Sequence, residues 1–113
     1  MRLRILLAAC TMWGALWTQA ALAQQAAPVG DPAAAHKKIA MCEGCHGIPG
    51  YRTAYPEVYA VPKLGGQQPA YVLRALQAYK SGERSHPSMR GIASGLSEQD
   101  MADVAAYYGG VAK

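Results

Sequence analysis

The pattern of apolar and polar residues predicts a helix over residues 69–82, PAYVLRALQAYKSG. Apolar side chains recur there at i, i+3, i+4 and i+7, the spacing that gathers them on one helical face. These positions are Val72, Ala75, Leu76 and Tyr79. Gly82 is expected to end the helix.

A second helical pattern occupies the C-terminal part of the chain. Ser97 is followed three residues later by Asp100, an arrangement similar to a capping box, so we expect a helix to begin at Ser97. Its apolar face is formed by Met101, Val104, Ala105 and Tyr108. The pair Gly109-Gly110 is expected to stop this helix.

A third helix is predicted from Pro32 to about Cys42, because Asp31 is a suitable N-cap and proline is favoured at the first helical position. Gly44 and Gly47 should break it. Residues 48–68 and 83–96 have no helical or alternating period and are expected to be loops, the first with a helical turn near Glu57.

The predicted fold is therefore all-α, with three or more helices and two long loops. No strand pattern and no internal repeat is convincing. A structureless loop of about twenty residues is uncommon in a compact domain unless it wraps something. The first loop thus indicates a bound group.

Residues 1–23, MRLRILLAACTMWGALWTQAALA, have the layout of a secretory signal: two arginines, an apolar run and a small-x-small cleavage motif. We expect cleavage between Ala23 and Gln24. Residues 24–30 are then a flexible lead-in, and 31–113 form one domain. An uncleaved membrane anchor is less favoured, because a spanning helix needs about 20 apolar residues. Lipoprotein processing at Cys10 would leave too short an apolar run before the cut.

Export implies an oxidising compartment and leaves two cysteines, Cys42 and Cys45, in the mature chain. Nine Lys/Arg against seven Asp/Glu is too small an excess to indicate nucleic-acid binding. The chain has no Phe, and both Trp lie in the signal, so the aromatic residues of the mature domain are seven Tyr. A small domain with so thin a core is marginal on its own. Something bulky and apolar is expected to complete it.

The segment CEGCHG, residues 42–47, suggests what that group is. A structural zinc site needs four ligands, and His36 and His86 lie far from the motif in sequence. A thioredoxin-like dithiol follows a strand, and none is predicted here. A disulfide across two residues would close almost no loop. Covalent haem attachment explains the whole motif, with Cys42 and Cys45 bonded to the two vinyl groups and His46 bound to iron.

The remaining contacts of one covalent haem c can also be assigned. A ligating histidine donates its other ring N–H to an acceptor, and the carbonyl of Pro62 is our choice. For the second axial position we favour Met89, in the loop between the last two helices, with His86 as the alternative. Met41 is too close to Cys42 to reach the opposite haem face, and Met101 is expected to be a core residue.

The ordered motifs CEGCHG, VPKLGGQ, YVLRALQAYKSGER and LSEQDMADVAAYY resemble those of the class I c-type cytochromes. The chain is most similar to small bacterial monohaem cytochromes related to one half of the periplasmic di-haem cytochromes, from about Asp31 to Tyr108. The resemblance implies crossing N- and C-terminal helices around the haem. It also implies axial ligation by His46 and Met89, Leu64 against the haem, and Tyr107 or Tyr108 packed against Ala35.

Two departures from this family pattern concern the surroundings of the haem. The loop GYRTAYPEVYA is longer and richer in tyrosine than in many relatives, and Gly65 replaces a frequent alanine. They leave the haem assignment unchanged but bear on the haem edge and its partner.

We therefore expect a periplasmic electron-transfer protein rather than an enzyme. It should bind redox protein partners, with no nucleic acid and no stable membrane insertion after signal cleavage. A basic rim of Lys63, Lys80, Arg84 and Arg90 is one hypothesis for docking; ordinary solvated charges are the other. Alternative functions are a haem electron-acceptor subunit of a periplasmic dehydrogenase or, less favoured, an open-site haem enzyme or gas sensor.

Overall fold

The computed structural model describes residues 26–54 and 58–111, and its regular elements are helices. They are α1 (Pro32–Ala35), α2 (Ala40–His46), α3 (Pro69–Ser81), α4 (Pro87–Ser94) and α5 (Glu98–Gly110). In the described ranges, extended pairing is limited to an isolated antiparallel bridge between Arg52 and Ala60. The predicted all-α class is confirmed.

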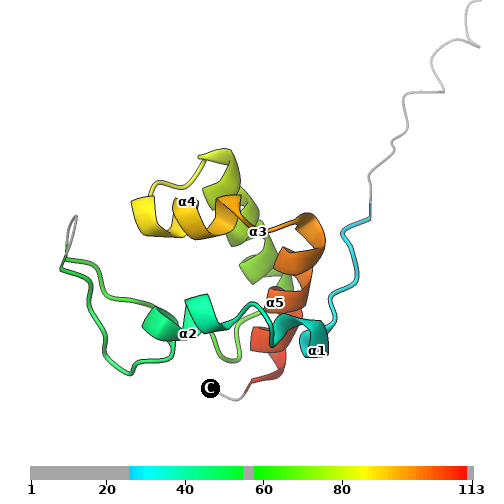
Figure 1. Ribbon diagram of the computed structural model, residues 1–113, viewed down its shortest axis with the longest axis horizontal. Coiled ribbons are helices and arrows are strands. Elements are labelled where there is room, and N and C mark those ends of the chain that lie inside the picture. Colours follow the sequence, from blue (N-terminus) through cyan, green and yellow to red (C-terminus); the bar gives the residue numbers. More distant parts are fainter. Residues whose placement is uncertain (1–25, 55–57, 112–113) are drawn as a thin grey trace, which may run out of the picture.

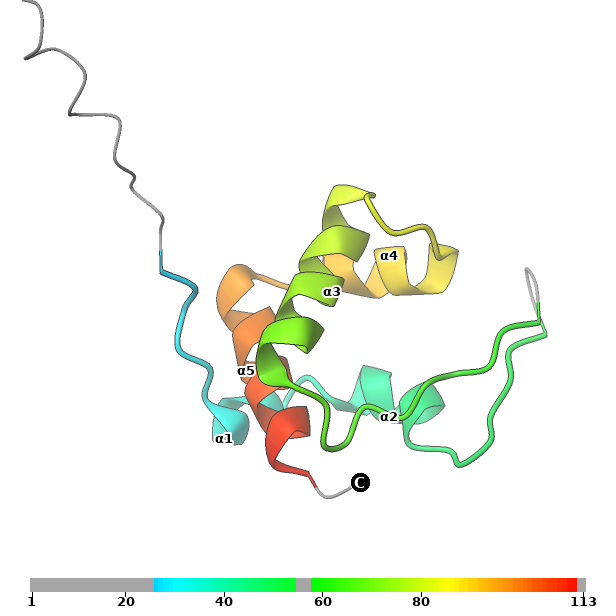
Figure 2. The same ribbon diagram turned by 180° about the vertical axis from the view of Figure 1, so that it is seen from behind.

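Helix α5 is the centre of the packing. It contacts α1 on one side and α3 on another, while α4 packs on α3 (Figures 1 and 2). The buried core cluster draws on α1, α3 and α5, on the turn after α1 and on the connection between α4 and α5: Ala35, Ile39, Val72, Leu73, Leu76, Leu96, Met101, Ala102, Val104, Ala105 and Tyr108. The N- and C-terminal helices thus cross, as predicted.

The two helices with the clearest sequence patterns are confirmed. Gly82 follows α3 in the left-handed conformation, at φ 88°. At α5, the Ser97 hydroxyl accepts from the backbone N–H of Asp100, and the Asp100 carboxylate accepts from that of Ser97, which completes a capping box. The predicted apolar face of α5 is buried. The helix extends through Gly110, so the first of the two glycines does not stop it.

The prediction of one continuous first helix is wrong. After α1 the backbone forms a turn, in which the N–H groups of Lys38 and Ile39 both bond to the carbonyl of Ala35. The turn buries Ile39 in the core, and the chain then starts again as α2. Gly44 lies inside α2 and does not break it; Gly47 is the C-cap. Both cysteines therefore belong to one short helix.

The prediction of a loop throughout residues 83–96 is also wrong, because residues 87–94 form α4. Pro87 occupies the first turn of this helix, where proline needs no N–H partner, so it initiates rather than interrupts. His86 is the N-cap. Met89 consequently lies on a helix packed against α3 instead of in a flexible loop.

The long segment 48–68 is irregular where it is described, as predicted. The N–H of Thr53 bonds to the carbonyl of Tyr59, and the N–H of Val61 bonds to that of Tyr51, so the segment doubles back on itself. Farther on, the N–H of Gly66 bonds to the carbonyl of Tyr108 and ties the segment to α5. The helical turn expected near Glu57 lies outside the described residues.

The N-terminal signal predicted for residues 1–23 also lies outside the described residues. The end of the expected lead-in lies against α5: the Val29 carbonyl accepts from the Gln99 side-chain amide at 2.8 Å. A Cβ at Gly30 would lie 2.1 Å from the carbonyl oxygen of Ala102, so this approach requires glycine. None of the described helices is both long and apolar enough to cross a bilayer.

Adjacent glycines near the end of α5 provide a test of this packing. A Cβ at Gly109 would lie 2.4 Å from Cγ of Pro69, whereas one at Gly110 would meet nothing within 4 Å. We expect Gly109→Ala to lower the free energy of unfolding by about 1–3 kcal/mol through overpacking. Gly110→Ala should leave it unchanged or raise it by a few tenths of a kcal/mol. Urea denaturation measures both, and equal effects would contradict the close contact.

Asp103 should make stability depend on pH. It is 3% exposed and accepts hydrogen bonds from the Asp31 N–H and the Gln99 amide, both at 2.8 Å. The pKa of this carboxyl is lowered mainly by the hydrogen bond from the Asp31 N–H. The hydrogen bond from Gln99 and the charge of Lys38 lower it further. A lowered folded pKa gives stability that is present above the unfolded pKa of about 3.9 and is lost as pH falls through the folded value.

We therefore expect Asp103→Asn to be less stable than wild type at neutral pH, with the difference shrinking as pH falls below about 4. Chemical denaturation across pH measures this difference. Glu83→Gln removes the same charge at an exposed position and is the matched control. A difference independent of pH would show that the carboxylate charge of Asp103 contributes nothing.

Candidate haem-binding site

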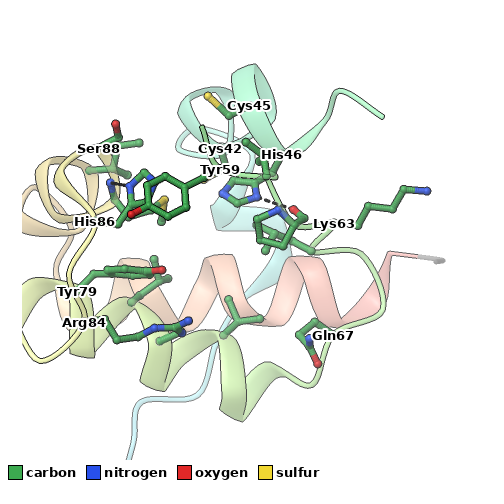
Figure 3. A pocket seen from close by; sticks show the side chains of 18 of the residues that line it. Cys42, Cys45, His46, Tyr59, Lys63, Gln67, Tyr79, Arg84, His86 and Ser88 are labelled. Atoms are coloured by element: carbon green, nitrogen blue, oxygen red, sulfur yellow. Dashed lines mark hydrogen bonds between the residues drawn. The ribbon is translucent and has the colours of Figure 1, made fainter. Parts of the chain in front are cut away.

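A cavity of about 430 Å³ lies between α2, the 59–64 segment and the α3–α4 pair. This volume is in the range typical of pockets for small molecules and cofactors. Most of its wall is apolar, and the polar exceptions are mainly those labelled in Figure 3. All six sequence-predicted site residues line it: Cys42, Cys45, His46, Pro62, Leu64 and Met89.

Helix α2 carries both of the cysteines that line this cavity. Cys42 and Cys45 are three residues apart on one helix, a spacing that brings side chains to neighbouring positions on its surface. Both are free and partly buried. Burial, and then the charge of Glu43, raise the pKa of the Cys42 thiol, while the Tyr108 hydroxyl partly opposes this. The two sulfurs could therefore form two covalent links to one group in the cavity.

The hydrogen bond of His46 determines which ring nitrogen is available. Its Nδ1 lies 2.7 Å from the backbone carbonyl oxygen of Pro62. A carbonyl can only accept, so Nδ1 must carry the proton and donate. In the neutral ring this leaves a lone pair on Nε2, the form that binds a metal. His46 could therefore be an iron ligand.

His86 has the opposite arrangement. Its Nδ1 accepts a hydrogen bond from the backbone N–H of Met89 at 3.4 Å, so the proton of the neutral ring is on Nε2. Neither nitrogen then has a free lone pair for a metal. Among the residues that the structure describes, the sulfur of Met89 makes no hydrogen bond, and Met89 is partly buried against the core. Between the two candidates considered for the second axial position, the geometry favours Met89.

The other two methionines of the domain lie elsewhere. Met101 is fully buried in the core, as predicted. Met41 is 55% exposed and lies beside Cys42 on α2, where it reaches the rim of the cavity.

The four residues of the hypothetical basic rim have different environments. Lys63 and Arg84 line the cavity, and the Arg84 guanidinium lies 4.9 Å from the centre of the Tyr79 ring, a cation–π distance. Lys80 instead donates to the carbonyl of Leu96 at 2.5 Å and does not line the cavity. Arg90 is exposed. The basic charge at the cavity is therefore limited to two of the four.

Sequence reasoning missed the aromatic side chains of the cavity wall. Tyr79 could have been found, because it belongs to the apolar face predicted for α3. Nothing in the sequence predicted Tyr59, because residues 48–68 have no regular pattern of apolar positions. In the structure its ring packs on that of His86, with 5.0 Å between centres (Figure 3).

The tyrosine pair at the end of α5 packs at the helix crossing. Tyr107 makes an edge contact with His36, and Tyr108 is buried in the same core cluster as Ala35. Within the described residues the Tyr108 hydroxyl has no hydrogen bond of good geometry, although it lies near the Cys42 thiol. Burial, followed by the nearby Cys42 and Glu43, raises the pKa of Tyr108. The phenol thus stays neutral beside α2.

A metal ion held only by protein side chains would be an alternative to a bound haem. Across residues 26–54 and 58–111, no three His, Cys, Asp or Glu side chains gather closely enough to hold a metal ion. What the described residues do gather is two thiols, one imidazole with a free Nε2 and one thioether around an apolar cavity. This set fits a porphyrin with two covalent links and two axial ligands.

A helical domain with these groups around one cavity has the features of a c-type haem protein. The family model for cytochrome c matches residues 33–109. Cytochrome c-554(548) of Halomonas halodenitrificans is 42% identical over 82 residues, covering 70% of this chain and 94% of that protein. The chain belongs to the cytochrome c family, and the predicted likeness to class I c-type cytochromes is confirmed.

Other relatives are longer. Cytochrome c4 of Pseudomonas aeruginosa is 43% identical over 79 residues, which are 70% of this chain and 37% of that protein. The crystal structure of reduced cytochrome c4 from Pseudomonas stutzeri superposes with a TM-score of 0.55 at 28% identity, covering 76% of this chain and 52% of that one. The chain thus spans about half or less of these proteins.

A further relative has a name that refers to an enzyme. The cytochrome subunit of sulfide dehydrogenase from Chlorobaculum tepidum is 31% identical over 72 residues, covering 64% of this chain and 61% of that subunit.

Proposed function

We propose that this protein is an electron carrier with one covalently attached haem. In this proposal Cys42 and Cys45 form the thioether links, and His46 and Met89 are the axial iron ligands. The observation that carries it is the bond from His46 Nδ1 to the Pro62 carbonyl, because it frees Nε2 at a cavity that both thiols line. Family membership supports the same conclusion.

The attachment needs no oxidant. Cys42 and Cys45 would hold the group through thioether links, each formed by addition of the S–H across a vinyl C=C bond, with the sulfur on one carbon and the hydrogen on the other. The proposal is supported by the spacing of Cys42 and Cys45 along α2 and by the cavity that both residues line, because two links to one rigid ring require neighbouring thiols.

The haem, when bound, supplies one-electron chemistry between Fe(II) and Fe(III). The chain's own contribution is to keep both axial ligands in place and to surround the group with apolar side chains. A His/Met pair raises the reduction potential relative to other ligand sets, since the thioether favours the reduced state. The Pro62 carbonyl fixes the tautomer and the ring orientation of His46. Leu64 packs between the core and the cavity and is proposed to contact the haem.

We also propose that residues 1–23 direct export and are removed, so that the protein works in the periplasm. Its partners would be redox proteins that dock weakly, because electron-transfer encounters bury little surface. A haem subunit of a dehydrogenase is the second candidate, favoured by the similarity to the cytochrome subunit of sulfide dehydrogenase. Copurification with an enzyme at fixed stoichiometry would support that candidate over a free carrier.

Intact-mass spectrometry tests the covalent haem. We expect the protein matured in a host with cytochrome c assembly to have the mass of residues 24–113 plus one haem. Each of Cys42→Ala and Cys45→Ala should retain one link, and the double variant should lose all covalent haem. Mature wild type with the mass of the bare chain would reject the proposal.

The second axial ligand is tested with Met89→Ala. We expect loss of the red absorption band that a ferric iron shows with methionine, and ready binding of carbon monoxide in the ferrous state. The reduction potential should fall by on the order of 0.1 V, within the ~0.8 V that axial ligands span. Met101→Leu, a volume-conserving change in the core, is the control and should keep the band. A Met89→Ala protein with an unchanged spectrum would exclude Met89.

A further inference from the structure

The N-cap of α4 connects two features that the electron-carrier function does not explain. His86 precedes Pro87 in an extended conformation, and its side chain accepts from the backbone N–H of Met89. The same imidazole packs against Tyr59, which comes from the irregular segment on another wall of the cavity (Figure 3). Both side chains line the cavity.

Histidine is an unusual choice for this position, because Ser, Thr, Asp and Asn are the preferred N-caps. Those residues would satisfy the same N–H group, but they offer no ring. The ring contact with Tyr59, at 5.0 Å and a 56° tilt, is therefore what the imidazole adds to a cap. The His86 side chain is partly buried, and it contacts both the Met89 N–H and the Tyr59 ring.

We propose that His86 is a positioning residue for Met89: its Nδ1 fixes the first turn of α4, and Tyr59 holds the imidazole in the capping orientation. The capped group is the backbone N–H of Met89 itself, so the contact acts on the residue whose sulfur is to meet the iron. This inference rests on the proposed ligation by Met89. It assigns His86 a role that requires it not to be a ligand.

Tyr59 also connects the two sides of the site. Three residues after it, the Pro62 carbonyl accepts from His46, so one short stretch of chain contacts both proposed axial positions. A shift of this stretch would therefore disturb two contacts. It would move the Pro62 carbonyl that His46 faces, and it would move the Tyr59 ring that packs on His86, the N-cap of α4. The tyrosine-rich loop that departs from the family pattern thus has a structural role in this chain.

Competition by imidazole for the ferric iron of the haem-loaded protein tests the proposal. Imidazole binds only where the methionine has left, so its apparent affinity rises as the methionine-bound state is weakened. His86→Ala removes both cap and ring, and we expect about tenfold tighter imidazole binding. His86→Asn restores a cap without a ring and should show about a twofold gain.

The variants at Tyr59 separate the ring contact from the cap. The imidazole affinity of Tyr59→Ala should match that of His86→Asn, and that of Tyr59→Phe should match wild type. In the His86→Asn background, Tyr59→Ala should cause no further change in affinity, because no imidazole side chain is left for Tyr59 to contact. The intensity of the methionine–iron band should follow the same order. Ser97→Ala removes the N-cap of α5 instead, and should lower stability without changing imidazole affinity.

The outcomes distinguish the two proposals. If Met89→Ala does not tighten imidazole binding, Met89 is not the ligand and both proposals fail. If Met89→Ala tightens binding but His86→Ala and Tyr59→Ala bind as wild type does, the positioning role fails and the ligand assignment stands. If His86→Ala abolishes low-spin ferric haem while Met89→Ala preserves it, His86 is itself the ligand and the inference is overturned.

Discussion

The hydrogen bond from His46 to the Pro62 carbonyl is the interaction on which the site depends. It joins the end of α2 to a loop sixteen residues later and requires the proton to be on Nδ1. The second histidine of the cavity, His86, accepts where His46 donates. The two histidines thus have different tautomers, because one faces a backbone carbonyl and the other a backbone N–H. Both line the cavity, so their position alone would not distinguish them.

This arrangement needs a fixed platform, and α5 provides it. The helix contacts α1 and α3, holds the 64–68 segment through the Tyr108 carbonyl, and holds the chain before α1 through Gln99 and Asp103. Two glycines allow close approaches to this helix: Gly30 packs against the backbone of Ala102, and Gly109 packs against the ring of Pro69. A core without phenylalanine can therefore be well packed around α5, while the wall of the cavity remains open to a large apolar group.

The sequence predicted the elements whose signals are local. The capping box at Ser97 and Asp100, the buried face of α5 and the glycine after α3 all follow from residues within a few positions of one another. The cysteines and His46 were also readable, because their spacing is itself the motif. Pro62 is predicted from the need of a ligating imidazole for an acceptor, and its carbonyl oxygen lies 2.7 Å from Nδ1 of His46.

The predictions that were wrong depended on tertiary contacts. The first helix is interrupted between α1 and α2 by a turn in which Ile39 is buried in the core, and no local pattern shows this turn. Pro87 is compatible with a loop, but proline is equally suited to start a helix, and here it starts α4, which packs against α3. The contact of Tyr59 with His86 joins residues 27 positions apart, one of them in an aperiodic segment. Propensity and periodicity contain no information on such a pair.

The irregular segment 48–68 follows from the geometry it must satisfy. It has to leave α2, present a carbonyl to His46, place a ring against His86 and return to the end of α5. A helix or a strand repeats one backbone conformation and would direct side chains and carbonyls at fixed intervals. Contacts at residues 59, 62 and 66 on three different partners require the backbone to change direction between them. An irregular backbone forms fewer regular hydrogen bonds than a helix or a strand. The backbone hydrogen bonds of residues 51, 53 and 66 partly compensate for this loss.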